Sequence, residues 1–121
     1  MDRREFQRVS YSAAAEIRGT KNNWQSETQQ VSLKALQLTT PANWKGQVGD
    51  HYTVVFPLTE SPVFQLQMVT TVMQQDDETI VFSIEHIDLE SLSHLARLIE
   101  LHLGDHDLMR AELDKITQPT K

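Results

Sequence analysis

The sequence has 121 residues, which is enough for one compact domain with its own hydrophobic core and too few for two. Seventeen Asp and Glu residues against eleven Lys and Arg residues give a formal net charge of −6, which disfavours binding along a nucleic-acid polymer. The absence of cysteine excludes disulfide bonds, thiolate metal sites and thiol catalysis. No apolar run approaches the roughly 18 residues that span a bilayer, so we expect a cytoplasmic protein without membrane insertion.

Apolar and polar residues alternate with a period of two over most of the first 85 residues, as in half-buried strands. The pattern predicts strands over residues 9–18, 24–31, 35–40, 52–56, 63–72 and 80–85. Pro41 and Pro57 end two of them, and Asp76 with Asp77 marks the turn into the last. Six short strands at nearly regular spacing indicate a small barrel or sandwich.

The period then changes to that of helices. A wide apolar stripe includes Leu92, Leu95 and Ile99, Asp88 or Ser91 is a plausible N-cap, and Gly104 is well placed to end the helix. A second helix is expected from Asp105 or Asp107, with an apolar face made of Met109, Leu113 and Ile116. Strands followed by helices predict an α+β fold.

The five histidines are the first residues to test for metal or acid–base chemistry. Glu90 and His94 are four residues apart on the predicted helix, and so are His102 and His106, although Gly104 lies between the second pair. Neither spacing matches a known ligand set, and the sequence has no nucleophile motif, phosphate-binding glycine loop or dinucleotide fingerprint. We therefore expect no metal, no cofactor and no enzymatic activity.

Three of the eleven basic residues lie within the first eight positions, where Arg3, Arg4 and Arg8 surround Phe6. Guanidinium groups are planar and permanently charged, and each can bond two acceptors, as phosphate oxygens or the O6/N7 edge of guanine require. Taken alone, the cluster favours an ordinary charged and frayed terminus over a binding site.

A second segment, Gln30 to Ala35, carries Ser32 in a turn that leads into the strand of Leu36 and Leu38. With the Arg4-x-x-x-Arg8 pair before it, this arrangement resembles the PilZ domain family. The predicted exit from the last strand into the helix also resembles that family, through Phe82, Ile87, Asp88, Ser91, His94, Leu95, Arg97, Leu98 and Gly104. The resemblance covers nearly the whole chain in the right order.

The resemblance implies a six-stranded antiparallel β-barrel followed by C-terminal helices, within one domain over residues 1–121. Residues 1–9 would form a flexible arginine-motif segment, residues 10–88 the barrel and residues 89–117 the helices. It also implies a bacterial receptor for the second messenger cyclic di-GMP. Such a receptor signals by a ligand-dependent change of conformation or surface to a protein partner, unidentified here, in motility, adhesion or biofilm control.

Two positions of the second motif depart from the family pattern of Asp or Asn, any, Ser, any, any, Gly. Gln30 keeps an amide but is one methylene longer than Asn, and Ala35 replaces a glycine that serves either a positive φ or close approach of the ligand. These changes predict binding that is roughly ten- to hundredfold weaker than with the full motif. The ligand-binding residues that the resemblance implies are Arg3, Arg4, Arg8, Gln30, Ser32 and Ala35.

Two alternatives follow from the same sequence. The chain could be a PilZ domain that no longer binds the nucleotide and serves as a protein-protein interaction module, with Leu101 beside Leu98 as part of its surface. It could instead be a small barrel that binds single-stranded nucleic acid, although the acidic charge opposes this reading. Trp24 and Trp44 could stack on such a ligand, but their positions favour a role in covering the ends of the barrel.

Overall fold

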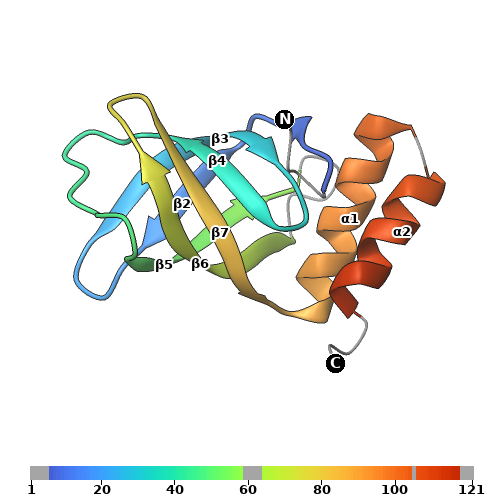
Figure 1. Ribbon diagram of the computed structural model, residues 1–121. Helices are drawn as coiled ribbons and strands as arrows, with labels where there is room; N and C mark the ends of the chain where they lie inside the picture. Colours follow the sequence, from blue (N-terminus) through green and yellow to red (C-terminus); the bar gives the residue numbers. More distant parts are fainter. Residues whose placement is uncertain (1–5, 59–63, 105, 118–121) are drawn as a thin grey trace.

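The computed structural model of the chain describes residues 6–58, 64–104 and 106–117, which form a β-barrel with two helices at one end (Figure 1). Six strands close the antiparallel barrel in the order β3-β2-β5-β6-β7-β4, with β4 paired back to β3, and β1 pairs with β3 as a seventh strand. The predicted six-stranded barrel is thus confirmed. The elements are β1 (Val9–Ser10), β2 (Ala14–Arg18), β3 (Asn23–Val31), β4 (Ala35–Thr39), β5 (His51–Pro57), β6 (Gln65–Gln75), β7 (Thr79–Ile87), α1 (Leu89–Leu103) and α2 (His106–Thr117).

The core fills the barrel with the residues that the alternation assigned to one face. Along β6, Leu66, Met68, Thr70 and Val72 are at most 1% exposed, while the residues that alternate with them are exposed or half-buried. Leu36 of β4 lies directly opposite Phe82 of β7, and both are buried. Facing apolar pairs of this kind set the register, because a slip of one residue would turn each side chain to the outside.

The first predicted strand, 9–18, is broken into β1 and β2, and the register against β3 shifts by one residue between them. Thr28 of β3, which is 1% exposed, occupies the break. Its hydroxyl donates to the carbonyl of Tyr11 and accepts from the N–H of Ala13 at 2.9 Å. A buried hydroxyl needs hydrogen-bond partners, and the irregular residues 11–13 supply them.

An aromatic cluster covers the end of the barrel away from the helices. The rings of Trp24 and Trp44 lie 4.7 Å apart, and Tyr52 packs edge-on against Trp24. The indole N–H of Trp24 donates to the carbonyl of Asn43 at 3.1 Å, and that of Trp44 donates to Oε1 of Gln75 at 2.8 Å. Both tryptophans therefore have structural partners at the barrel end, as the sequence predicted.

The helices close the other end, where α1 lies between the barrel and α2 (Figure 1). Asp88 caps α1 by accepting the N–H of Ser91 at 3.2 Å, and Gly104, with φ of 72°, ends it. Both boundaries agree with the sequence analysis. The buried apolar residues of these helices are Leu92, Leu95, Ala96, Leu98, Ile99 and Met109. Within the described residues, neither helix is long and apolar enough to cross a membrane.

Candidate functional site

The second motif forms the turn between β3 and β4, and Ser32 is its hydrogen-bonding centre. The N–H of Ser32 donates to the carbonyl of Ala35 at 2.9 Å, and Oγ of Ser32 accepts the N–H groups of Ala35 at 3.0 Å and Lys34 at 3.3 Å. The hydroxyl can also donate to the carbonyl of Ala35, at 3.2 Å. Ser32 is 2% exposed. The hydroxyl that was expected to meet a ligand is thus already engaged within the turn, and contact with a ligand stays a prediction.

Arg8, Gln30 and Ala35 lie together on the outward face of β3 and β4, where they line one shallow depression that leaves no room for a water molecule between its side chains. Gln30 is paired with Gln37 on β4, and Gln37 is paired with Val81 on β7, so strand pairing fixes the floor of the depression. Arg8 reaches it because the next two residues of the chain, β1, pair with the end of β3. Two motifs that are distant in sequence therefore meet at one place.

Ala35 starts β4 with an ordinary extended backbone. Among the described non-glycine residues only Asn43 has a positive φ, of 63°. The glycine of the family pattern is therefore not required here for its conformational freedom. The methyl group of Ala35 instead occupies space in the depression beside Arg8, so any effect on a ligand would be steric.

A polar ladder borders the depression and was not predicted. The side-chain amide of Gln37 donates to Oε1 of Gln29 at 2.8 Å, and the hydroxyl of Thr79 donates to the same oxygen at 3.3 Å. The Nε2 group of Gln29 donates to the hydroxyl of Thr39 at 3.0 Å. A β-bulge between Thr28 and the next paired residue of β3 brings Gln29 to this surface. Strict alternation would have given Gln29 and its neighbour opposite faces, and the sequence carries no clear signal of the bulge.

Arg3 and Arg4, the other basic residues of the first motif, lie outside the described residues. The described part of the segment begins at Phe6, which is half-buried and packs against the core. Arg8 is likewise half-buried. Of the first motif, the structure thus describes one predicted arginine, and it lies beside the second motif.

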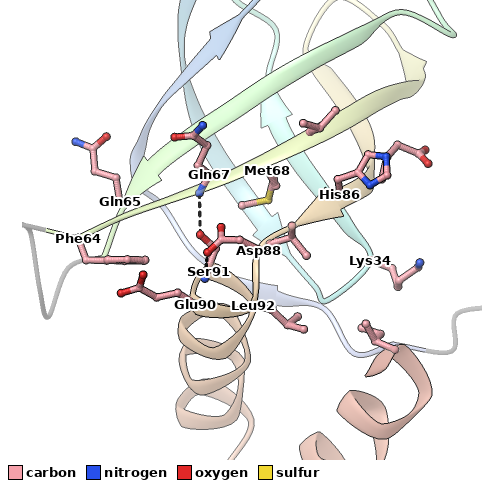
Figure 2. A pocket seen from close by; sticks show the side chains of 14 residues that line it. Lys34, Phe64, Gln65, Gln67, Met68, His86, Asp88, Glu90, Ser91 and Leu92 are labelled. Carbon is pink, nitrogen blue, oxygen red and sulfur yellow. Dashed lines mark hydrogen bonds between the residues drawn. The ribbon is translucent and has the colours of Figure 1, made fainter. Parts of the chain in front are cut away.

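A wide, open hollow of about 950 Å³ lies elsewhere, between the barrel and the start of α1 (Figure 2). Ser91 is held there by two hydrogen bonds: its Oγ accepts the N–H of Gln67 at 3.3 Å and its own N–H donates to Asp88. The bonds from Ser91 lower the pKa of Asp88, which keeps this carboxyl ionised. Glu85 and Glu90 add two further carboxyl groups to the lining. Three acidic side chains outnumber the one lysine of the lining, Lys34, so the hollow disfavours a doubly anionic ligand.

The histidines make local contacts. The ring of His94 lies 4.2 Å from that of Phe64, and Nδ1 of His102 donates to the carbonyl of Leu98 at 2.9 Å. Within the described ranges, no three His, Asp or Glu side chains gather as metal ligands would.

Residues 2–101 match the family model described as PilZ domain. The fold is similar to that of the inhibitor of motility MotI/DgrA of Bacillus subtilis, with a TM-score of 0.72 and 13% identity over 88% of this chain and 54% of that one. This chain therefore spans about half the length of MotI/DgrA. It is also similar to the PilZ domain of CeSA from a cellulose-synthesizing bacterium, with a TM-score of 0.61 and 12% identity over 81% of this chain and 96% of that one. The two likenesses concern the fold, and the family match, which covers most of the sequence, shows that this chain belongs to the PilZ domain family.

Proposed function

We propose that this chain is a bacterial, cytoplasmic receptor for cyclic di-GMP, which it binds without performing chemistry on it. The observation that carries the proposal is the meeting of Arg8 with Gln30 and Ala35 in one depression on the outside of the barrel. These residues belong to two separate motifs, and the packing of the hydrophobic core does not require them to lie side by side. The binding residues are Arg8, Gln30 and Ala35, with Arg3 and Arg4 as further contacts and Ser32 as the centre of the turn that carries the second motif.

The chemistry of the depression suits a nucleotide with two phosphates. The guanidinium of Arg8 can stack on a purine ring while it bonds the edge of a guanine or a phosphate oxygen. The amides of Gln30 and Gln37 offer both donors and acceptors at the same surface. Because the chain as a whole is acidic, a local cluster of arginines favours a small anion over a long polyanion.

The two departures from the family motif weaken this site without removing it. Losing one hydrogen bond at Gln30 costs about 0.5 to 1.5 kcal/mol. The methyl group of Ala35 adds a steric cost of its own, since the backbone there is unstrained. Together the two changes correspond to binding that is roughly ten- to hundredfold weaker than with the full motif.

Isothermal titration of the purified protein with cyclic di-GMP at near-physiological salt tests the proposal, with GMP as the control nucleotide. We expect saturable binding at micromolar affinity that GMP does not reproduce. A receptor of this kind would act on a protein partner in motility, adhesion or biofilm control. The absence of both heat and thermal shift at high ligand concentration would contradict the receptor function.

A second function, that of a protein-protein interaction module without a nucleotide, is supported by exposed apolar side chains. Leu89 and Leu101 of α1 are 73% and 57% exposed, and Met73 of β6 is 56% exposed. Large exposed apolar residues favour contact surfaces when they gather. A chain that fails the titration but keeps its fold would be assigned to this second function.

A further inference from the structure

Glu112 is a charged residue in an apolar setting. It lies in the middle of α2 and is 2% exposed, although glutamate is rarely buried without a partner. Its Oε2 accepts the backbone N–H of Gln7 at 2.9 Å, and its Oε1 is buried with no hydrogen-bond partner among the residues that the structure describes. Burying a carboxylate in this state is costly. A residue that serves packing alone would be apolar here, so the contact with Gln7 needs an explanation.

Residues 6–8, which we call the arm, are fixed at both ends. Phe6 packs against the core, and Nζ of Lys115 on α2 lies 5.9 Å from the centre of its ring. Gln7 is bound to Glu112. Immediately after the arm, β1 pairs with the end of β3, where Val9 lies opposite Val31. Arg8 therefore lies between an attachment to α2 and an attachment to the barrel.

This placement matters because Arg8 also lines the depression with Gln30 and Ala35. We propose that Glu112 is a positioning residue of the nucleotide site, which holds the arm on α2 so that Arg8 stays over the second motif. The inference rests on the proposed function and extends the site from the barrel to α2. A pre-ordered arm binds more tightly because less conformational freedom is lost when the ligand arrives.

The charge of Glu112 has the sign that this role requires. The arm that it holds carries Arg8, and Arg3 and Arg4 precede the arm in the sequence. A carboxylate on α2 attracts such a segment, and it accepts a backbone N–H more strongly than a neutral side chain does. The buried Oε1, which has no hydrogen-bond partner among the described residues, lowers the stability of the fold, and packing does not explain this loss. The loss is consistent with a glutamate whose role is to hold the arm.

Five variants separate positioning from general stability. Glu112→Leu removes the acceptor and makes the buried position apolar, whereas Glu112→Gln retains an oxygen that can accept from Gln7. Gln7→Pro removes the donor N–H, since proline has none, whereas Gln7→Ala keeps it. Asp114→Asn, at an exposed position of α2, is the matched control for removing one negative charge from that helix.

Two measurements are made on each protein: amide hydrogen exchange of the arm by NMR, and titration with cyclic di-GMP. Glu112→Leu is expected to remove the protection of the Gln7 amide and to weaken nucleotide binding roughly tenfold. Gln7→Pro is expected to weaken binding to a similar extent, and the double variant no further, because both changes remove one interaction. Gln7→Ala and Asp114→Asn are expected to bind within about twofold of the unchanged protein, and Glu112→Gln, which keeps the acceptor oxygen but loses the charge, is expected to bind with an affinity between those of the unchanged protein and Glu112→Leu.

The results that would overturn the positioning role differ from the results that would overturn the proposed function. If the unchanged protein binds the nucleotide but Glu112→Leu and Gln7→Pro bind equally well, the positioning role is overturned. An unprotected Gln7 amide in the unchanged protein also overturns it. If the unchanged protein binds no nucleotide, the proposed function itself falls, and amide exchange then decides alone whether Glu112 anchors the arm. Should Glu112→Leu fail to fold, Gln7→Pro carries the test without touching α2.

Discussion

Ser32 and Ala35 close the β3–β4 turn on each other, because the N–H of Ser32 donates to the carbonyl of Ala35 at 2.9 Å and the N–H of Ala35 donates to Oγ of Ser32 at 3.0 Å. This mutual bonding ties the middle of the second motif to its last residue. Gln30 and Ala35 flank the depression only as long as the turn keeps this shape. The serine of the motif is therefore tied to the geometry of the site even without a ligand.

Replacing Ser32 with Ala is expected to lower the free energy of unfolding by about 1 to 2 kcal/mol, because the partly buried N–H of Ala35 loses its acceptor. Urea denaturation measures the loss. Ser12→Ala, at an exposed position, is the control and should change stability by less than about 0.5 kcal/mol. If Ser32→Ala weakens nucleotide binding at unchanged stability, Ser32 acts on the ligand and not on the turn.

Restoring the family motif with Gln30→Asp and Ala35→Gly is expected to tighten cyclic di-GMP binding roughly ten- to hundredfold. The same change should lower stability by about 0.5 to 1 kcal/mol, since glycine adds freedom to the unfolded chain and Ala35 has no positive φ to relieve. Titration and denaturation should thus move in opposite directions. Equal affinity in the restored and unchanged proteins would mean that this site binds by a geometry of its own.

Removing the side chain of Arg8 with Arg8→Ala is expected to abolish or strongly weaken nucleotide binding and to leave the melting temperature nearly unchanged, because Arg8 is half-buried and outside the core. Arg18→Ala is the matched control. Arg18 is an exposed arginine whose Nε pairs with Glu16 at 2.8 Å on the barrel surface, where an ion pair adds little. A large fall in melting temperature for Arg8→Ala would assign Arg8 to the fold and not to the site.

The sequence predicts the parts of this molecule that depend on local patterns. Alternation gives the inward faces of β4, β6 and β7, and the caps Asp88 and Gly104 follow from the chemistry of helix ends. The break at residues 11–13 and the bulge at Gln29 escape prediction, because each depends on which strand lies alongside. The burial of Glu112 escapes it for the same reason, since a glutamate on a short helix is usually exposed.

The candidate site, like the fold, could be predicted from the sequence only in part. The six residues predicted to bind the ligand follow from a resemblance between motifs, and the structure brings three of them, Arg8, Gln30 and Ala35, to one depression. The engagement of Ser32 within its own turn could not be read from spacing. Nor could the contact of the arm with α2, because Gln7 and Glu112 are 105 residues apart in sequence and no local pattern links them.

A substitution at Phe82 tests whether the side chains of β7 alternate between the core and the outer surface. It is fully buried opposite Leu36, and its ring lies 6.5 Å from that of Trp44. Phe82→Ala is expected to lower the free energy of unfolding by about 3 to 5 kcal/mol through lost burial and the cavity left behind. Its neighbour Val81 faces outward on the same strand, so Val81→Ala should cost clearly less. Equal losses in urea denaturation would contradict the assignment of inward and outward faces along β7.

The acid stability of the fold should depend on Asp76 and Asp88. Hydrogen bonds from the N–H groups of Glu78 and Thr79 lower the pKa of Asp76, and those from Ser91 lower the pKa of Asp88, in both cases below an ordinary value of 3.8. A carboxyl group whose pKa is lower in the folded state stabilises the fold above its unfolded pKa, and the contribution is lost as the pH falls through the folded pKa.

Unfolding free energies measured by urea between pH 7 and pH 2 test this dependence on both carboxyl groups. The unchanged protein should lose stability progressively below about pH 4. Asp76→Asn and Asp88→Asn keep an acceptor oxygen but do not titrate, so each variant should be less stable than the unchanged protein at pH 7. The difference in unfolding free energy between each variant and the unchanged protein should shrink or vanish near pH 2, so the measurement at pH 2 serves as the control for the one at pH 7. Parallel pH profiles would show instead that the loss of stability in acid arises at other carboxyl groups.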